Sequence, residues 1–219
     1  MIGINQAIYG CDEDVVKIDE YYVSFVEPDT YFNRALIDAC RIGDEDLAIE
    51  LIATTEVNYD YVDVCGNTAL IYACQNNLTR VATILIELKK SLPFHVNKYG
   101  NTALIYACQN NMDLVAFELI SKTECNHGQS NNDNYTALMY ACQNNMEEVI
   151  YELISTNNSN LCHVNDDGFN AIVYSYQNNM HEICDLLYQL SNGNIITNHL
   201  NSISKEIIAT VHLIHLGML

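Results

Sequence analysis

The sequence lacks tryptophan, and its 219 residues include only 2 prolines, 9 glycines and 9 basic residues. So little proline and glycine excludes a collagen-like chain and Pro/Gly-rich disorder. No apolar run reaches the roughly 18 residues that a membrane-spanning helix needs. The N-terminal segment MIGINQAIYGCDEDVVK has neither a basic start nor a sustained apolar stretch. We therefore expect no signal peptide and no membrane span.

The 28 acidic residues far outnumber the basic ones and give a formal net charge of −19. Phosphate backbones and anionic membrane surfaces are bound through lysine and arginine. We therefore expect neither nucleic acid nor membrane as a partner. Residues 12–63 hold 15 acids against three bases. This segment is either a solvated surface or a patch that steers a basic partner.

The 9 cysteines form no CxxC motif, and their number is odd. These features are not typical of a disulfide scaffold or a zinc module, so we expect reduced thiols in a cytoplasmic protein. Cys65 is expected at an exposed loop tip. His212 and His215 can share a helix face, but no further metal ligand lies near them, and no GxSxG, P-loop or HExxH motif occurs. We predict no cofactor, no metal site and no enzyme activity.

A ten-residue string recurs along the chain. TALIYACQNN begins at Thr68 and again at Thr102, and TALMYACQNN begins at Thr136. NAIVYSYQNN begins at Asn170, and a degenerate copy, RALIDACRIG, begins at Arg34. The starts are 34 residues apart, which is typical of a stacked repeat array. We predict a cap over residues 1–28, repeats over 29–62, 63–96, 97–130, 131–164 and 165–192, and a capping helix within 193–219.

Each unit predicts a helix, a short turn, a second helix and a long loop. Thr68 can cap the first helix, and Asn77 can end it because asparagine tolerates the left-handed conformation. One stripe of the first helix carries Leu70, Ala73 and Cys74. One face of the second helix, LTRVATILIEL, carries Val81, Ile84, Leu85 and Leu88. A single unit cannot bury such stripes, but stacked units can.

The unit resembles the ankyrin repeat, in which a turn ending in glycine precedes T-P-L-H-x-A-A and then G-H before the second helix. DVCGNTALIYACQNN, KYGNTALIYACQNN, NDNYTALMYACQNN and DDGFNAIVYSYQNN stand in those places. Alanine replaces the proline, asparagine replaces the glycine, and Ile71, Ile105 and Met139 replace the histidine. The tetratricopeptide repeat also has 34 residues but expects a tryptophan, which this chain lacks. Loss of the histidine indicates greater reliance on apolar packing between repeats.

The resemblance implies an all-α ankyrin-repeat solenoid of about five helix-turn-helix repeats, with β-hairpin-like loops and terminal caps. It also implies a non-catalytic scaffold or adaptor that binds a protein partner through a concave groove and its loop fingers. The composition, rich in asparagine, isoleucine and tyrosine, is similar to that of ankyrin proteins from protists and amoeba-infecting giant viruses. A viral source would place the partner in the host cytosol.

Several residue types recur at every repeat. The cysteines are interpreted as small buried hydrophobes, because neighbouring repeats about 10 Å apart exceed the reach of a disulfide: Cys40, Cys74, Cys108 and Cys142. The resemblance places a Gln-Asn pair on the groove of each repeat, where it would contact the partner: Gln75, Asn76, Gln109, Asn110, Gln143 and Asn144. Recent duplication explains this uniformity, or a regular groove recognises an extended or repetitive partner.

The loop tips vary from repeat to repeat. Aromatic side chains dominate binding hot spots, so we predict Tyr99, Tyr135 and Phe169 as exposed contact anchors. The other predicted tip contacts are Lys98, Asn101, Asp166 and Asp167.

The predicted C-terminal helix, at about residues 205–216, is apolar on more than one face. It is either fully packed on the last repeat or a second surface that allows self-association through residues 205–219. Two further hypotheses follow: an acidic decoy that captures a basic protein, and a structural subunit that assembles through this helix.

Overall fold

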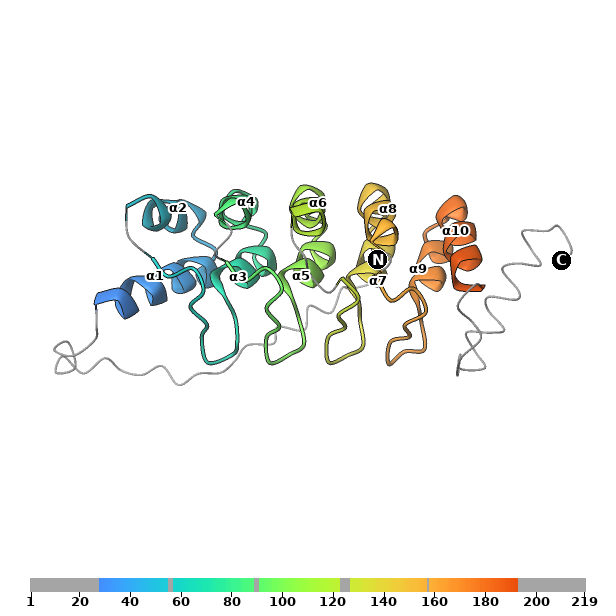
Figure 1. Cartoon of the computed structure of the whole chain (residues 1–219), viewed down its shortest axis with the longest axis horizontal. Coiled ribbons are helices and arrows are strands. Elements are labelled where there is room, and N and C mark those ends of the chain that lie inside the picture. Colours follow the sequence, from blue (N-terminus) through green and yellow to red (C-terminus); the bar gives the residue numbers. More distant parts are fainter. Residues whose placement is uncertain (1–27, 55–56, 89–90, 123–126, 157, 193–219) are drawn as a thin grey trace, which may run out of the picture.

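The computed structural model describes residues 28–54, 57–88, 91–122, 127–156 and 158–192. These residues form ten helices in two layers, with long loops that all extend to one side (Figure 1). The first layer contains α1 (Pro28–Ile42), α3 (Ala69–Gln75), α5 (Ala103–Gln109), α7 (Ala137–Gln143) and α9 (Ala171–Gln177). The second layer contains α2 (Glu45–Thr54), α4 (Thr79–Glu87), α6 (Asp113–Lys122), α8 (Glu147–Ser155) and α10 (His181–Asn192).

Each first-layer helix packs against the next one and against the second helix of its own repeat. The described residues contain no strand, only an isolated antiparallel bridge between Ser130 and Thr136. This elongated helical array confirms the predicted all-α solenoid. The predicted N-terminal cap over residues 1–28 lies outside the described part except for Pro28, where α1 begins. The predicted C-terminal helix within residues 193–219 also lies outside it, and the repeat boundaries remain predictions.

Local sequence explains where the short first-layer helices begin and end. The Thr68 hydroxyl accepts a hydrogen bond from the Ile71 N–H at 3.2 Å, which satisfies one of the N–H groups left free at a helix start. Asn77 follows α3 with φ of 60°, the left-handed conformation that closes a helix. The predicted cap and stop are therefore confirmed, and the same pair recurs at Thr102 with Asn111 and at Thr136 with Asn145.

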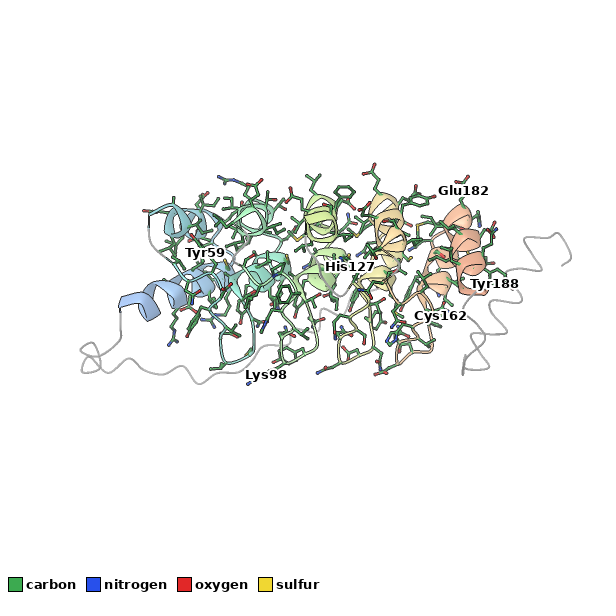
Figure 2. The ribbon with its side chains drawn as sticks, viewed as in Figure 1. Tyr59, Lys98, His127, Cys162, Glu182 and Tyr188 are labelled. Carbon is green, nitrogen blue, oxygen red and sulfur yellow. The ribbon has the colours of Figure 1, made fainter. Side chains whose placement is uncertain are left out.

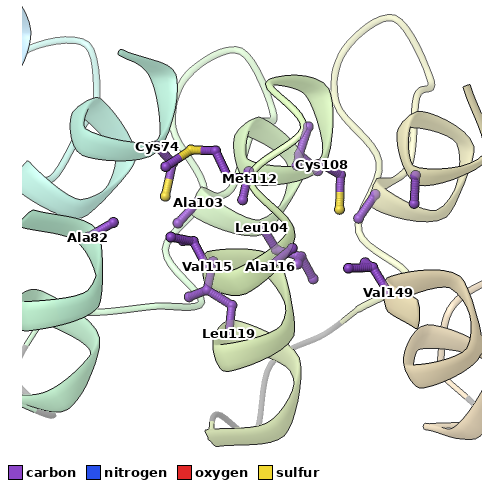
Figure 3. Close-up of a cluster of buried hydrophobic side chains, with 14 of the residues drawn as sticks. Cys74, Ala82, Ala103, Leu104, Cys108, Met112, Val115, Ala116, Leu119 and Val149 are labelled. Carbon is purple, nitrogen blue, oxygen red and sulfur yellow. The ribbon is translucent and has the colours of Figure 1, made fainter. Parts of the chain in front are cut away.

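The core lies between neighbouring repeats. Figure 3 shows Leu104 of α5 beside Val115 and Ala116 of α6, with Cys108 and Val149 on the side of the next repeat. Ile71, Ile105 and Met139 are each only 1% exposed, so the positions that lost the repeat histidine join this apolar core. Burying one such side chain contributes about 1.5–3 kcal/mol. The predicted reliance on apolar packing agrees with this burial.

The predicted stripe on the second helix is partly wrong. Val81 and Leu85 are buried as expected, but Ile84 is only half-buried and Leu88 is 39% exposed. Ala82 and Ile86 are buried in their place. The buried face is rotated because α4 packs against α3, α2 and α6 at once.

The repeated cysteines are buried, as predicted. Cys40, Cys74, Cys108 and Cys142 are 0% exposed, and all four thiols are free. Burial raises the pKa of Cys40 to about 12 and raises the pKa of the other three as well, so these thiols stay protonated and unreactive. Two expectations about Cys65 were wrong: it is only 6% exposed, and it is disulfide-bonded.

Candidate functional site

Four tight loops, which we call the fingers, occupy residues 63–67, 97–101, 131–135 and 165–169. Each finger is closed by two backbone hydrogen bonds. The carbonyl of its first residue accepts from the N–H of the fourth residue, which has positive φ. The N–H of the first residue donates to the carbonyl of the fifth. In the second finger, Asn97 Oδ1 also accepts hydrogen bonds from the N–H groups of Tyr99 at 3.0 Å and Asn101 at 2.9 Å. The finger conformation is therefore fixed by its own polar groups.

Neighbouring fingers are joined to one another. The Lys98 N–H donates to the Cys65 carbonyl at 3.1 Å, and the Asn132 N–H donates to the Tyr99 carbonyl at 2.9 Å. At the far end, Asn134 Nδ2 donates to Asp166 Oδ1 at 2.7 Å. The fingers therefore form a connected edge along the array, and this edge is ordered without a bound partner.

The repeated tyrosines attach the fingers to the first-layer helices. The Tyr72 hydroxyl donates to Asp63 Oδ2 at 2.8 Å, so its role is internal. In the last two repeats, the Tyr174 hydroxyl donates to the Tyr135 hydroxyl at 3.0 Å, which in turn donates to Asp167 Oδ2 at 2.9 Å. Burial raises the pKa of Tyr72 to about 12, so this hydroxyl remains a neutral donor.

The asparagine of each Gln-Asn pair bridges two repeats. Asn76 Nδ2 donates to the carbonyls of Cys40 at 2.8 Å and Arg41 at 3.0 Å. Asn110 donates in the same way to Cys74 and Gln75, both at 2.9 Å. Asn144 and Asn178 repeat this contact with the carbonyls of residues 108–109 and 142–143. We call these four asparagines the clamp. Each clamp asparagine hydrogen-bonds carbonyls at the C-terminal end of the first-layer helix in the preceding repeat. The Cys40, Cys74 and Cys108 carbonyls also accept a backbone hydrogen bond from Gly43, Asn77 and Asn111, respectively, so the clamp adds a second bond to these oxygens.

The glutamine of each pair behaves differently. Gln109, Gln143 and Gln177 are exposed, and their side chains form no hydrogen bond with any described residue. Gln75 is half-buried, and its Oε1 is buried without a hydrogen-bond partner. Structure therefore separates two residues that look equivalent in the sequence. Contact between the Gln-Asn pairs and a partner remains a prediction. The structure adds a clamp role within the fold for Asn76, Asn110 and Asn144.

A hollow of about 320 Å³ lies between the first-layer helices and the first two fingers, and we call it the inner hollow. Its lining residues include Arg34, Arg41, Tyr61, Gln75, Tyr99 and Tyr106. Asp38 lies between the two arginines, 2.8 Å from Arg41 Nη2 and 3.6 Å from Arg34 Nε. The arginine side chains stay 73% and 52% exposed, so they can still reach a ligand.

Arg34 and Arg41 line the inner hollow but are not among the site residues predicted from the sequence. Their spacing of seven residues, with Asp38 at the fourth, places all three on one face of a helix. This spacing can be read from the sequence once a helix is predicted there. Only the folded structure shows that the helix face carrying these residues borders a hollow, because the fingers form its other side.

The predicted tip contacts differ in exposure. Lys98 is exposed and lies at the end of its finger (Figure 2), and Asp166 and Asp167 are exposed as well. Tyr99 is half-buried at the inner hollow. Asn101 is only 9% exposed, because its Nδ2 donates inward to the Tyr106 hydroxyl at 3.3 Å.

Two of the predicted exposed anchors, Tyr135 and Phe169, pack within the fold and are less exposed than predicted. Tyr135 stacks on Tyr140 with ring centroids 5.0 Å apart, and Phe169 meets Tyr174 edge-on at 5.9 Å. Both rings are half-buried, so each presents only part of its surface to a partner. Whether these residues contact a partner remains a prediction.

The described part of the chain has no group of three or more His, Cys, Asp or Glu side chains placed to hold a metal ion. None of the helices seen there is long and apolar enough to cross a bilayer.

A known protein family matches the chain. The family described as "Ankyrin repeats (3 copies)" matches residues 36–128 and 113–199, which together span most of the chain. No curated protein sequence is significantly similar to it.

Proposed function

Because the chain belongs to the ankyrin repeat family, we propose that it is a non-catalytic scaffold or adaptor that binds a protein partner through its inner hollow and fingers. Repeats of this family are generally protein–protein interaction modules and are typically non-catalytic. The proposal adds the surface that performs the binding.

The observation that carries this proposal is the hydrogen-bonded edge of fingers beside the inner hollow. The Lys98 and Asn132 N–H groups link three consecutive fingers through backbone bonds of 3.1 and 2.9 Å. A surface that is already ordered loses little conformational entropy when a partner binds, so more of the contact energy appears as affinity.

The lining of the inner hollow supports a protein as the ligand. Tyrosine and arginine are enriched at binding hot spots, and this hollow contains Arg34, Arg41, Tyr61 and Tyr99. The two arginines supply hydrogen-bond donors for a carboxylate or a backbone carbonyl. The proposal includes a cytoplasmic location. The free thiols of six cysteines in the described part of the chain support this location, but the disulfide at Cys65 does not.

The test captures partners from a cytosolic lysate with the intact protein and identifies them by mass spectrometry. Two variants are run in parallel: Tyr99→Ala, and the double variant Arg34→Ala with Arg41→Ala. The control is Leu114→Ala, since Leu114 lies on α6 and is 74% exposed. A hot-spot substitution costs about 2 kcal/mol or more, which weakens binding about 30-fold.

We expect a discrete partner that both variants lose and the control keeps. A partner that all proteins capture equally would refute binding through the inner hollow and fingers. Repeating the capture at about 0.5 M salt tests the acidic decoy, because many basic partners lost equally from every protein would favour it.

The acidic decoy has less support in the described residues than in the sequence. Three acids of the segment 12–63 are paired with arginines: Asp38 with Arg34 and Arg41, and Glu45 and Asp46 with Arg80. Assembly through residues 205–219 concerns a segment outside the described part.

A further inference from the structure

The repeated string TALIYACQNN can be explained position by position, with one exception. The threonine caps the helix; in the second copy, for example, the Thr102 hydroxyl accepts from the Ile105 N–H at 3.2 Å. The alanines, leucine, isoleucine and cysteine are buried in the core. The tyrosine packs beneath the fingers, the first asparagine is the clamp, and the second adopts positive φ to end the helix.

The glutamine is the exception. None of these structural roles falls to Gln75, Gln109, Gln143 or Gln177, which we call the Gln ladder. Each ends a first-layer helix, three of the four are exposed, and none of their side chains bonds to a described residue. Gln75 lines the inner hollow beside Tyr99 and Tyr106, which places the start of the ladder at the proposed binding surface.

The clamp also fixes where the Gln ladder stands. The backbone carbonyls of Gln75, Gln109 and Gln143 each accept a hydrogen bond from the clamp asparagine of the next repeat, at 2.8–3.0 Å across the array. The same contact therefore fixes the position of each glutamine-bearing helix end relative to the next repeat. Four side-chain amides follow one another along one side of the array.

The spacing of such a ladder matches an extended polypeptide. Packed helices lie about 8–10 Å apart. An extended chain of the polyproline II type advances about 3.1 Å per residue and makes one turn in three residues, so its backbone groups return to the same side at every third residue. Three residues therefore span about one repeat. A primary amide offers both a donor and an acceptor, as the N–H and C=O of one peptide group require.

We propose that the Gln ladder binds the backbone of an extended segment of the partner protein, with one contact every third residue. This inference rests on the proposed function and names its partner class. Contacts to the backbone do not depend on the partner's side chains, so the variable fingers would determine which sequences bind. Four glutamines span three intervals, which correspond to a segment of roughly ten residues.

The experiment uses the full chain and a phage-displayed library of random 12-residue peptides. The best binders are synthesised, and their affinities are measured by fluorescence polarisation. Each backbone amide is then replaced in turn by an ester, which removes one N–H donor and leaves the side chains unchanged. We expect sensitive positions to recur every third residue, each weakening binding about 3- to 10-fold.

Protein variants supply the second readout. Gln109→Ala and Gln143→Ala should each weaken binding by a similar factor. In each variant, one of the ester substitutions that weakens binding to the parent protein should have no further effect on affinity, as a double-mutant cycle would show. The matched control is Gln189→Ala on α10, also exposed, which should leave affinity unchanged. The melting temperature of Gln109→Ala should match that of the parent, which excludes unfolding as the cause.

The outcomes separate this inference from the proposed function. Peptides that lose affinity to Tyr99→Ala but bind Gln109→Ala and Gln143→Ala normally would overturn the ladder and leave finger recognition intact. Ester sensitivity without a three-residue period would also overturn it. If no peptide binds, or if none is affected by Tyr99→Ala or by the Gln variants, both the ladder and the proposed function fail.

Discussion

Removal of one clamp asparagine should measurably weaken the array. Asn110 is half-buried and holds two carbonyl oxygens of the preceding helix, those of Cys74 and Gln75, each at 2.9 Å. In Asn110→Ala both hydrogen bonds disappear, and the two carbonyls lose a partner close to the core.

The magnitude follows from these two bonds. A net contribution of about 0.5–1.5 kcal/mol per hydrogen bond gives a loss of about 1–3 kcal/mol in the free energy of unfolding. Asn110→Asp should cost more than Asn110→Ala, because its carboxylate would face two carbonyl oxygens at the negative end of a helix. Asn76→Ala should cost less, since Asn76 is more exposed than Asn110.

Urea unfolding followed by circular dichroism measures the effect, with midpoint and slope fitted separately. Gln109→Ala is the matched control one residue away, where we expect a change within about 0.5 kcal/mol. If Asn110→Ala is as stable as the parent, or if Asn110→Asp is more stable than Asn110→Ala, the clamp does not stabilise the array and the reasoning fails.

Three further predictions test other parts of the fold. Gly100 and Gly168 both have positive φ, but a Cβ on Gly100 would lie 2.8 Å from Asn131 Cα, whereas one on Gly168 meets nothing within 4 Å. Gly100→Ala should therefore cost more stability than Gly168→Ala, by about 1 kcal/mol or more in urea unfolding; equal losses would contradict the close approach of the fingers. Burial lowers the pKa of His127 and His163 below their ordinary value of 6.5, so below that pH the unfolded chain binds more protons than the folded one. Stability should fall as pH drops below about 6.5, and unfolding curves at pH 7.5 and 5.5 that coincide would refute this. Tyr174→Phe removes the donor to the Tyr135 hydroxyl and the acceptor for Asn165, and should cost about 1–2 kcal/mol; an unchanged unfolding midpoint would show that these bonds contribute nothing.

The sequence determined those features that depend on residues close together in the chain. The 34-residue period established the stacked array, and the threonine cap and asparagine stop of α3 were predictable because each acts within about four residues. Burial of the repeated cysteines was predictable as well, since a small apolar residue on the core stripe of a helix has few other uses. These local signals were sufficient for the fold class.

The tertiary structure decided the role of residues whose partners lie in another repeat. Asn110 and Gln109 are adjacent and recur together, yet Asn110 reaches carbonyls 35 and 36 residues away while Gln109 remains exposed. Tyr135 looked like an exposed anchor, but its ring stacks on Tyr140. The buried face of α4 likewise depended on three neighbouring helices. Hydrogen bonds and packing act over a few ångströms, so only the stacking of repeats brings these groups within range.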